Sequence, residues 1–307
     1  MTRLKTTTIG SLYRFGEDLH ESIDKALAFQ KEHGSDLLTD GEQRTDMVSY
    51  FAESLAGLGV ESGVPVITGK IALQGSERDF SKVKDLAHIR SKLPDTPIKV
   101  AITGPTTLGM TCGSRKIASN YKGLLDFRLY EDIASALAPI ARELARLGAH
   151  VQIDEPFLSQ GYRDLAERVA LIDSIAEGLP ADRTSVHVCG FIGRFGVMDH
   201  LLRLKNASVL SFGFAGKQER PNIALLRRED FEDSGKKLGA GCIAVTPISE
   251  EEVDRPEAVR DLLQDIVDRV GADRIAYAHP DCGLRATRKS LVPIILTNFR
   301  AGVNLLG

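Results

Sequence analysis

One segment of the chain shows the fold most clearly: residues 150–189 read HVQIDEPFLSQGYRDLAERVALIDSIAEGLPADRTSVHVC. Its two ends, His150–Asp154 and Thr184–Cys189, are short runs with the apolar and β-branched residues expected of buried strands. Between them, Arg163–Glu177 carries apolar residues at the three- and four-residue spacing of an amphipathic helix. This order is that of a βαβ unit and predicts two parallel strands in one sheet.

The same alternation continues in both directions along the chain. It predicts eight strands, at Thr6–Gly10, Leu37–Thr39, Ile98–Thr103, His150–Asp154, Thr184–Cys189, Ser208–Phe212, Gly241–Val245 and Arg274–Ala278. It also predicts eight helices, at Glu17–His33, Thr45–Leu58, Phe127–Leu147, Arg163–Glu177, Arg194–Lys205, Asn222–Leu238, Pro256–Val270 and Leu284–Arg300. Eight strands that are each followed by a helix predict an α/β fold, a single (β/α)8 TIM barrel that takes up residues 1–307 as one domain.

One stretch, Gly57–Ser81, departs from this rhythm. It is rich in glycine and contains an alternating apolar run, VPVITGKIAL, at Val64–Leu73. Such a run next to glycines is typical of a β-hairpin. We therefore expect a small hairpin insertion after the second barrel helix, Thr45–Leu58.

The composition excludes several classes of protein. Of the 307 residues, 43% are hydrophobic and 26% are charged, as in an ordinary globular protein. The net charge is 39 − 42 = −3 with both signs mixed along the chain, which gives no reason to expect nucleic acid or a membrane as a partner. The N-terminus has no apolar signal core, and the four cysteines are too scattered for a disulfide framework, so we expect a cytoplasmic protein with free thiols.

A candidate metal site lies at the predicted strand ends. His187 and Cys189 are two residues apart on one strand, so their side chains point the same way. Cys282 follows the eighth strand, and the carboxyl ends of all strands meet at one mouth of a barrel. Two thiolates and one imidazole suit Zn²⁺ and leave one position open. The alternative is that both cysteines are core thiols and that His187 is a hydrogen-bonded structural residue.

Other polar residues at the strand ends also have two readings. His279 stands near Cys282 and has either a chemical or a structural role. Glu42, Asp154 and Glu155 resemble the paired carboxylates of a glycosidase, with a loop ion pair as the alternative for Glu155. The chain has no tryptophan and only 6% aromatic residues, so carboxylates that hold a substrate ammonium group are the better interpretation.

Six motifs together resemble the catalytic C-terminal barrel of cobalamin-independent methionine synthase. They occur in the order of that family and span residues 6 to 284: TTTIGS from Thr6, DGEQRTDMVSYF from Asp40, TGPTTL from Thr103, QIDEP from Gln152, HVCG from His187 and PDCGL from Pro280. The resemblance implies a zinc enzyme that binds a thiol amino acid and transfers an alkyl group to its sulfur. It implies His187, Cys189 and Cys282 as zinc ligands.

The resemblance also assigns a substrate site. Ser11, with the backbone of Ile9 and Gly10, and the carboxylates of Glu42 and Asp154 correspond to the residues that hold the carboxylate and the amine of homocysteine. Homocysteine is thus the implied thiol substrate and methionine the implied product.

Two positions depart from the family pattern. Gly213 stands where the family has a fourth zinc ligand, a glutamate, and Glu219 is the nearest acidic residue. Thr246 stands where the family has a proton-donating histidine, and His279 is the candidate substitute for it as a catalytic residue.

These departures bear on the methyl donor. The chain has no room for the second barrel of the folate-dependent enzymes, so it resembles the short core enzymes of the family. That likeness implies a methyl-corrinoid protein or another non-folate donor. The alternatives are an alkyltransferase for another thiol, such as a sulfonated coenzyme, and a barrel without turnover that binds a corrinoid or a partner protein.

Overall fold

A curled parallel sheet forms the centre of the structure, a computed structural model that describes residues 3–307. Seven strands lie in the order β1-β4-β5-β6-β7-β8-β9, and each neighbouring pair is parallel. They are β1 (Leu38–Thr39), β4 (Ile98–Thr103), β5 (His150–Asp154), β6 (Thr184–Val188), β7 (Val209–Phe212), β8 (Lys237–Gly241) and β9 (Ile275–His279). The predicted α/β class and the parallel sheet are confirmed.

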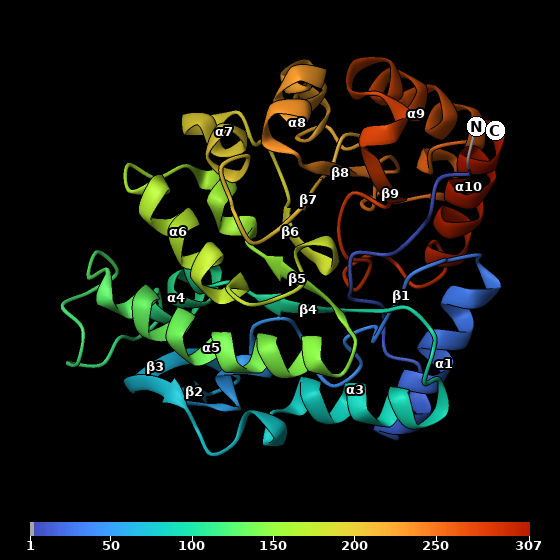
Figure 1. Cartoon of the computed structure of the whole chain (residues 1–307). Coiled ribbons are helices and arrows are strands. Elements are labelled where there is room, and N and C mark those ends of the chain that lie inside the picture. The colour runs from blue at the N-terminus through green and yellow to red at the C-terminus, as the bar shows by residue number, and fades with distance from the viewer. Residues whose placement is uncertain (1–2) are drawn as a thin grey trace.

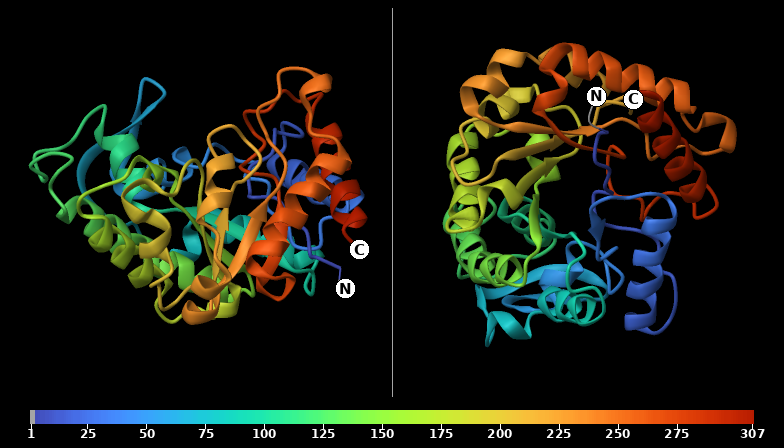
Figure 2. Two further views of the ribbon diagram at one scale, coloured as in Figure 1. Left: turned by 90° about the horizontal axis from the view of Figure 1, so that it is seen from above. Right: turned by 45° about the vertical axis from the view of Figure 1, so that its right-hand side comes forward.

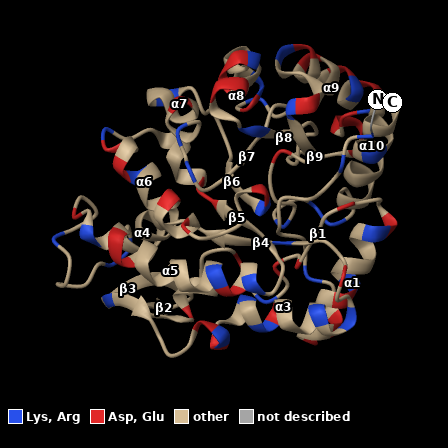
Figure 3. Ribbon diagram, in the orientation of Figure 1, with Lys and Arg blue, Asp and Glu red and all other residues tan. Residues whose placement is uncertain are grey.

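Helices cover the outside of this sheet, and the first described residues, from residue 3 on, lie beside the C-terminal end of the chain (Figures 1 and 2). The α-helices are α1 (Leu19–Glu32), α2 (Ser49–Ala52), α3 (Ser81–Lys92), α4 (Pro105–Gly113), α5 (Arg128–Arg146), α6 (Leu165–Ala176), α7 (Val197–Leu201), α8 (Arg228–Ser234), α9 (Pro256–Val270) and α10 (Val292–Leu305). Short 3-10 helices are η1 (Glu77–Asp79), η2 (Pro156–Gln160), η3 (Ala181–Arg183), η4 (Arg194–Gly196), η5 (Arg220–Leu225), η6 (Glu250–Glu252) and η7 (Ala272–Arg274). Charged residues lie mostly on helices and loops (Figure 3).

The core lies between the strands and the helices around them. All six residues of β4 are buried, as expected for a strand with both faces covered. On α5, Ile133, Leu137, Ile140 and Leu144 recur every three or four residues, and all four are fully buried. None of the described helices is long and apolar enough to cross a membrane.

The N-terminal segment lies between the two edge strands of the sheet. Thr6 forms an isolated parallel bridge with Ala278 of β9, and Thr7 forms one with Leu37 just before β1. The predicted strand Thr6–Gly10 is thus limited to two bridged residues. Its later carbonyl groups accept hydrogen bonds from side chains instead of a neighbouring strand: Gln152 donates to Ile9, and Thr39 to Gly10.

The region after β1 differs from the predicted helix Thr45–Leu58. Only Ser49–Ala52 is α-helical, and the chain enters an antiparallel hairpin of β2 (Leu55–Glu61) and β3 (Val64–Leu73). The apolar residues Phe51, Leu55 and Leu58, all buried, have helical spacing, although the last two lie on a strand. The hairpin therefore precedes α3, the long helix between β1 and β4, which the sequence pattern does not predict.

Strand β8 lies four residues earlier than the predicted Gly241–Val245. The predicted helix Asn222–Leu238 is replaced by η5 and the short α8, whose C-cap residue is Gly235 with a φ of +68°. β8 contains glycines because neighbouring groups approach its backbone closely: a Cβ on Gly239 would lie 2.7 Å from the Tyr277 ring. Glycine has a low strand propensity, so the sequence pattern does not predict this strand at its observed position.

The N-terminus of α4 is capped by Glu155, a residue that follows β5. The buried carboxylate accepts hydrogen bonds from the Thr106 N–H (2.8 Å), the Thr107 N–H (2.9 Å) and the Thr107 hydroxyl (2.7 Å). A side-chain acceptor here satisfies N–H groups that have no partner within the helix. The Glu155 carboxylate is therefore used to cap this helix, which is a structural role.

We predict that Glu155→Ala lowers the free energy of unfolding by about 3 kcal/mol, because three buried donors lose their acceptor. Urea unfolding measures the change, and Glu177→Ala, an exposed glutamate, is the control. Loss of activity with unchanged unfolding free energy would contradict the structural role.

Candidate metal centre and active-site cavity

Three potential metal ligands meet where β6 and β9 end. His187 is the fourth residue of β6, Cys189 follows that strand, and Cys282 lies three residues beyond β9. The Cys189 Sγ lies 2.9 Å from the His187 Nε2 and 2.6 Å from the Cys282 Sγ, and both thiols are free. All three donor atoms lie within 4.8 Å of one another. Two thiols and an imidazole in this arrangement fit a single soft or borderline cation such as Zn²⁺.

A chain of buried hydrogen bonds fixes the protonation of the His187 ring. The Pro280 carbonyl only accepts, so the His279 Nδ1 at 2.7 Å carries a proton. Burial lowers the pKa of His279 to about 3, so its ring is neutral and its Nε2 accepts from the Ser211 hydroxyl at 2.9 Å. The Ser211 oxygen in turn accepts from the His187 Nδ1 at 3.0 Å. The His187 Nε2 is left with a lone pair that points at Cys189.

His279 is therefore placed differently from the expected catalytic proton donor. Its side chain is fully buried, and both of its ring nitrogens are engaged in hydrogen bonds. It is linked to His187 by the hydrogen bonds of Ser211 and by an edge-to-face ring contact, with centroids 5.9 Å apart. This arrangement is that of a residue that orients His187 and not of one that exchanges protons with a substrate.

The metal centre opens into a cavity of about 500 Å³. Cys189, Cys282, Glu219, Asp281 and Thr246 are among the residues that line it, and no histidine is among the described lining residues. The cavity lies at the carboxyl ends of the strands, the usual place for catalytic residues in folds of this class. Thr246, which replaces the expected histidine, is thus at the cavity wall without an ionisable group.

Asp281 holds the loop after β7 against the metal centre. Its carboxylate accepts hydrogen bonds from the backbone N–H groups of Phe214 (3.0 Å), Ala215 (2.9 Å) and Gly216 (2.6 Å). Its neighbour in sequence is Cys282, so one short segment positions both a thiol and this loop. Burial raises the pKa of the Asp281 carboxyl to about 7, although the three N–H donors oppose that shift.

The side chain of Glu219 covers the position of Gly213. A Cβ on Gly213 would lie 2.8 Å from the Glu219 Cγ, and a Cβ on Gly216 would contact the Glu219 Oε2. Both glycines thus leave room for Glu219 to reach the cavity that Cys189 and Cys282 line. The Glu219 carboxylate is outside the group of three donor atoms described above.

Of the predicted substrate residues Ile9, Gly10 and Ser11, Ser11 lies beside the segment that follows Cys282. A Cβ on Gly283, the residue after Cys282, would contact the Ser11 Oγ, and the Leu284 N–H donates to the Ser11 carbonyl at 2.8 Å. Ile9 and Gly10 are buried, so only their backbone groups are candidates for contact with a substrate.

Asp154 is the last residue of β5, opposite His187 in the sheet register. It accepts from Gln152 at 2.7 Å. Burial, and then the charge of Glu42, raise the pKa of the Asp154 carboxyl. Glu42 and Asp154 are thus close enough for their charges to interact, and both are buried outside the described lining of the cavity.

Glu42 is paired with Lys82, a lysine that the sequence pattern does not single out. The Lys82 Nζ lies 2.9 Å from the Glu42 Oε1 and 3.6 Å from the Asp40 Oδ2, and its side chain is completely buried. Glu42 also has a left-handed backbone with a φ of 50°, a conformation that costs about 1 kcal/mol or more in a non-glycine residue. One oxygen of Glu42 is thus used by the protein, and the other is the candidate for a substrate ammonium.

Two further residues near the centre were not predictable as site residues. Nothing in the sequence distinguishes Ser211 from other serines in strands, because its role depends on hydrogen bonds to residues on β6 and β9. Lys99 is buried in β4, and its amine has no hydrogen-bond partner among the described residues. Burial lowers the pKa of Lys99 to about 7, while the charge of Asp154 opposes this shift.

Comparison with known proteins identifies a family. Residues 2–302 match the family model described as the cobalamin-independent synthase, catalytic domain. The methionine synthase of Methanothermobacter thermautotrophicus is 34% identical over 272 residues, which cover 86% of this chain and 82% of that protein. The 5-methyltetrahydropteroyltriglutamate–homocysteine methyltransferase of Yersinia enterocolitica is 29% identical, over 95% of this chain and 39% of that protein.

A solved structure has the same fold. The B12-independent methionine synthase from a Shewanella species, in complex with selenomethionine, superimposes with a TM-score of 0.82. The match covers 99% of this chain and 98% of that one at 23% sequence identity.

We predict that Ser211→Ala weakens Zn²⁺ binding about 10- to 100-fold, because His187 loses the hydrogen bond that keeps its Nε2 unprotonated. Competition with a chromophoric chelator measures the affinity. Ser208→Ala, at the start of the same strand segment, is the matched control. Equal affinities in the two variants would show that Ser211 does not orient the ligand.

Proposed function

The chain belongs to the cobalamin-independent synthase family, and on this premise we propose that it methylates the thiol of homocysteine to give methionine, with Zn²⁺ as its cofactor. Membership of the family makes the chain an enzyme, a methyltransferase. The observation that carries the proposal is the convergence of His187, Cys189 and Cys282 within 4.8 Å.

Zn²⁺ would be held by the His187 Nε2 and the two cysteine sulfurs, and it would supply a coordinated, deprotonated thiolate at neutral pH. A free alkyl thiol, with a pKa of about 8.5, is only a few per cent ionised at that pH. The homocysteine sulfur forms the new S–C bond while the bond between the methyl group and the donor breaks. The electron pair of the broken bond stays with the donor. The protein's own part is to align the sulfur and the methyl group.

Glu219 is our candidate for the acidic residue at the open side of this centre. The Glu219 side chain occupies the space next to the Gly213 backbone. A glutamate at position 213 would place its own side chain in that space. Glu219 faces the same cavity as both cysteines. Among the described residues it forms no ion pair, so its carboxylate is available to a cation.

The amino-acid part of homocysteine would bind beside the thiols. Ser11, next to Gly283, with the backbone of Ile9 and Gly10, would hold the carboxylate, and Asp154 and the free oxygen of Glu42 would hold the ammonium group. Two carboxylates favour a cationic substrate group over a sulfonate, which they would repel.

For the methyl donor we propose a corrinoid, free or bound to a protein, or another non-folate compound. A folate leaving group needs a proton at nitrogen, whereas a cobalt leaving group does not. Thr246 and the other described residues at the cavity wall offer no histidine for that proton, and His279 is occupied by Ser211 and Pro280.

We further propose that residues 1–307 form one catalytic (β/α)8 barrel, in which Thr6–Thr7 takes the place of the first strand. The two bridges of this segment, to Ala278 and to Leu37, support this view. The β2–β3 hairpin is then an insertion before α3.

We predict that wild-type protein binds about one Zn²⁺ per chain and that Cys282→Ser binds far less, because a three-ligand site has no spare ligand. Metal analysis after dialysis gives the content. Cys242→Ser, a buried cysteine outside the centre, is the control. Equal zinc in Cys282→Ser and wild type would remove the basis of the proposal.

We predict that Glu42→Gln raises the KM for homocysteine about 10- to 100-fold and leaves the zinc content unchanged, because a charge-assisted hydrogen bond is lost. A simple thiol without an amine should react weakly and equally well in both proteins. If both thiols lose activity equally, Glu42 supports the structure through Lys82 and does not bind the ammonium. Asp154→Asn provides a second variant in which the Lys82 pair stays intact.

A further inference from the structure

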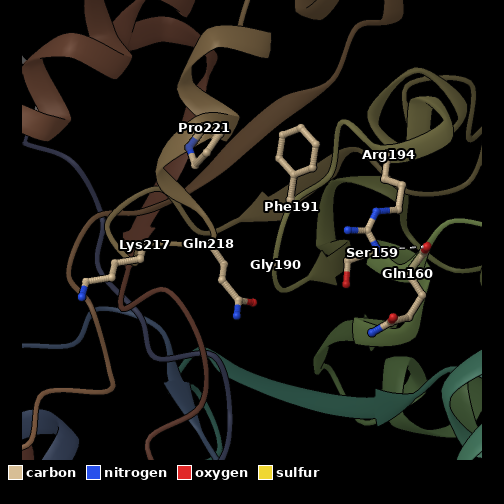
Figure 4. A pocket seen from close by; sticks show the side chains of 8 residues that line it. All are labelled: Ser159, Gln160, Gly190, Phe191, Arg194, Lys217, Gln218 and Pro221. Carbon is tan, nitrogen blue, oxygen red and sulfur yellow. Dashed lines mark hydrogen bonds between the residues drawn. The ribbon is translucent and has the colours of Figure 1, made fainter.

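A second cavity lies next to the metal centre. It has a volume of about 460 Å³ and lies between segments that follow β5, β6 and β7. Figure 4 shows Ser159, Gln160 and Arg194 on one side of it and Lys217 and Gln218 on the other. Phe191 and Pro221 complete its lining.

The two cavities share both of their bounding loops. Cys189 lines the metal cavity and the next residue, Gly190, lines the second one. In the loop after β7, Glu219 faces the metal cavity, whereas Lys217 and Gln218 face the second one. In both loops, therefore, residues that are neighbours in sequence line the two cavities.

The two cavities differ in charge. The charged residues that line the metal cavity are Glu219, Asp281 and Arg288, whereas those that line the second cavity are Arg194 and Lys217, with no acidic residue in its described lining. Neither cation forms an ion pair within the described residues; Arg194 donates only to the Gln160 carbonyl, at 3.4 Å. Two unpaired cations and two amide side chains suit an anionic, polar ligand.

The loop that carries Arg194 has an unusual backbone. Gly190 (φ +83°), Phe195 (φ +52°) and Gly196 (φ +70°) all lie in the left-handed region. The Phe195 side chain is 64% exposed and lies against Gly161, which follows Gln160. A non-glycine residue at positive φ and an exposed aromatic ring both cost stability, and such costs concentrate at functional sites.

We propose that this second cavity binds an anionic group of the methyl donor, which for a corrinoid is the phosphodiester of its nucleotide loop. The inference rests on the proposed function, because a methyl donor must bind beside the zinc-held thiol. The metal cavity then receives the amino-acid thiol, and the second cavity receives the anionic group of the donor.

The test uses two coloured probes, methylcobalamin and methylcobinamide, of which only the first carries the phosphodiester. Equilibrium dialysis with zinc-loaded protein gives both affinities. The variant is Arg194→Gln/Lys217→Gln, which keeps the side chains polar at exposed positions. The matched control is Arg203→Gln/Lys205→Gln, two exposed cations that precede β7 at the other end of the strand.

We expect wild type and control to prefer methylcobalamin, and the Arg194/Lys217 variant to lose roughly fivefold or more in affinity for methylcobalamin alone, since exposed charge contacts are individually modest. Equal binding of both probes by wild type, or an unchanged preference in the variant, would overturn the inference.

Methyl transfer to homocysteine, measured in parallel, separates this inference from the proposed function. If wild type transfers the methyl group and the variant has an unchanged KM for methylcobalamin, the donor cavity is refuted and the proposed function stands. A lost preference in the variant supports the cavity even where wild type transfers no methyl group, a result that would count against the proposed function.

Discussion

The hydrogen-bond chain from the Pro280 carbonyl through His279 and Ser211 to His187 is the interaction on which the candidate centre depends. It runs across the ends of β9, β7 and β6 and has no exposed member among its side chains. The Pro280 carbonyl can only accept a hydrogen bond, and this fixes which atom donates and which accepts in each bond of the series. The His187 Nε2 therefore keeps its lone pair. These bonds thus link β6, β7 and β9 at the candidate centre.

Charge is distributed around this centre in an ordered way. The Asp281 carboxylate accepts hydrogen bonds from three backbone N–H groups and so holds the loop that brings Glu219 to the cavity. The Lys82 ammonium neutralises the charge of the Glu42 carboxylate in a buried ion pair. An unpaired buried charge would lower the stability of the fold. The neighbouring cavity has the cations Arg194 and Lys217 and no acidic residue in its described lining. The sequence has nearly balanced charge overall, and the separation of signs arises only in the folded chain.

The strands with strong apolar patterns were predictable from the sequence: Ile98–Thr103 and His150–Asp154 agree with β4 and β5 residue for residue. Strand β8 was not, because its glycines are required by the close approach of Tyr277 and carry no strand signal. The motif His187–Cys189 with Cys282 could be read directly because ligand types and spacing are local. The partners Ser211 and Lys82 could not, since their importance lies in contacts between distant segments.

The most direct test of the account is X-ray absorption spectroscopy of the zinc-loaded protein before and after addition of homocysteine. In the resting protein we expect two sulfur ligands at about 2.3 Å and at least one lighter ligand. Addition of homocysteine should raise the number of sulfur ligands to three. A sulfur number that stays the same on addition of homocysteine, or zinc bound without sulfur, would contradict the assignment of His187, Cys189 and Cys282 as the centre that activates the substrate thiol.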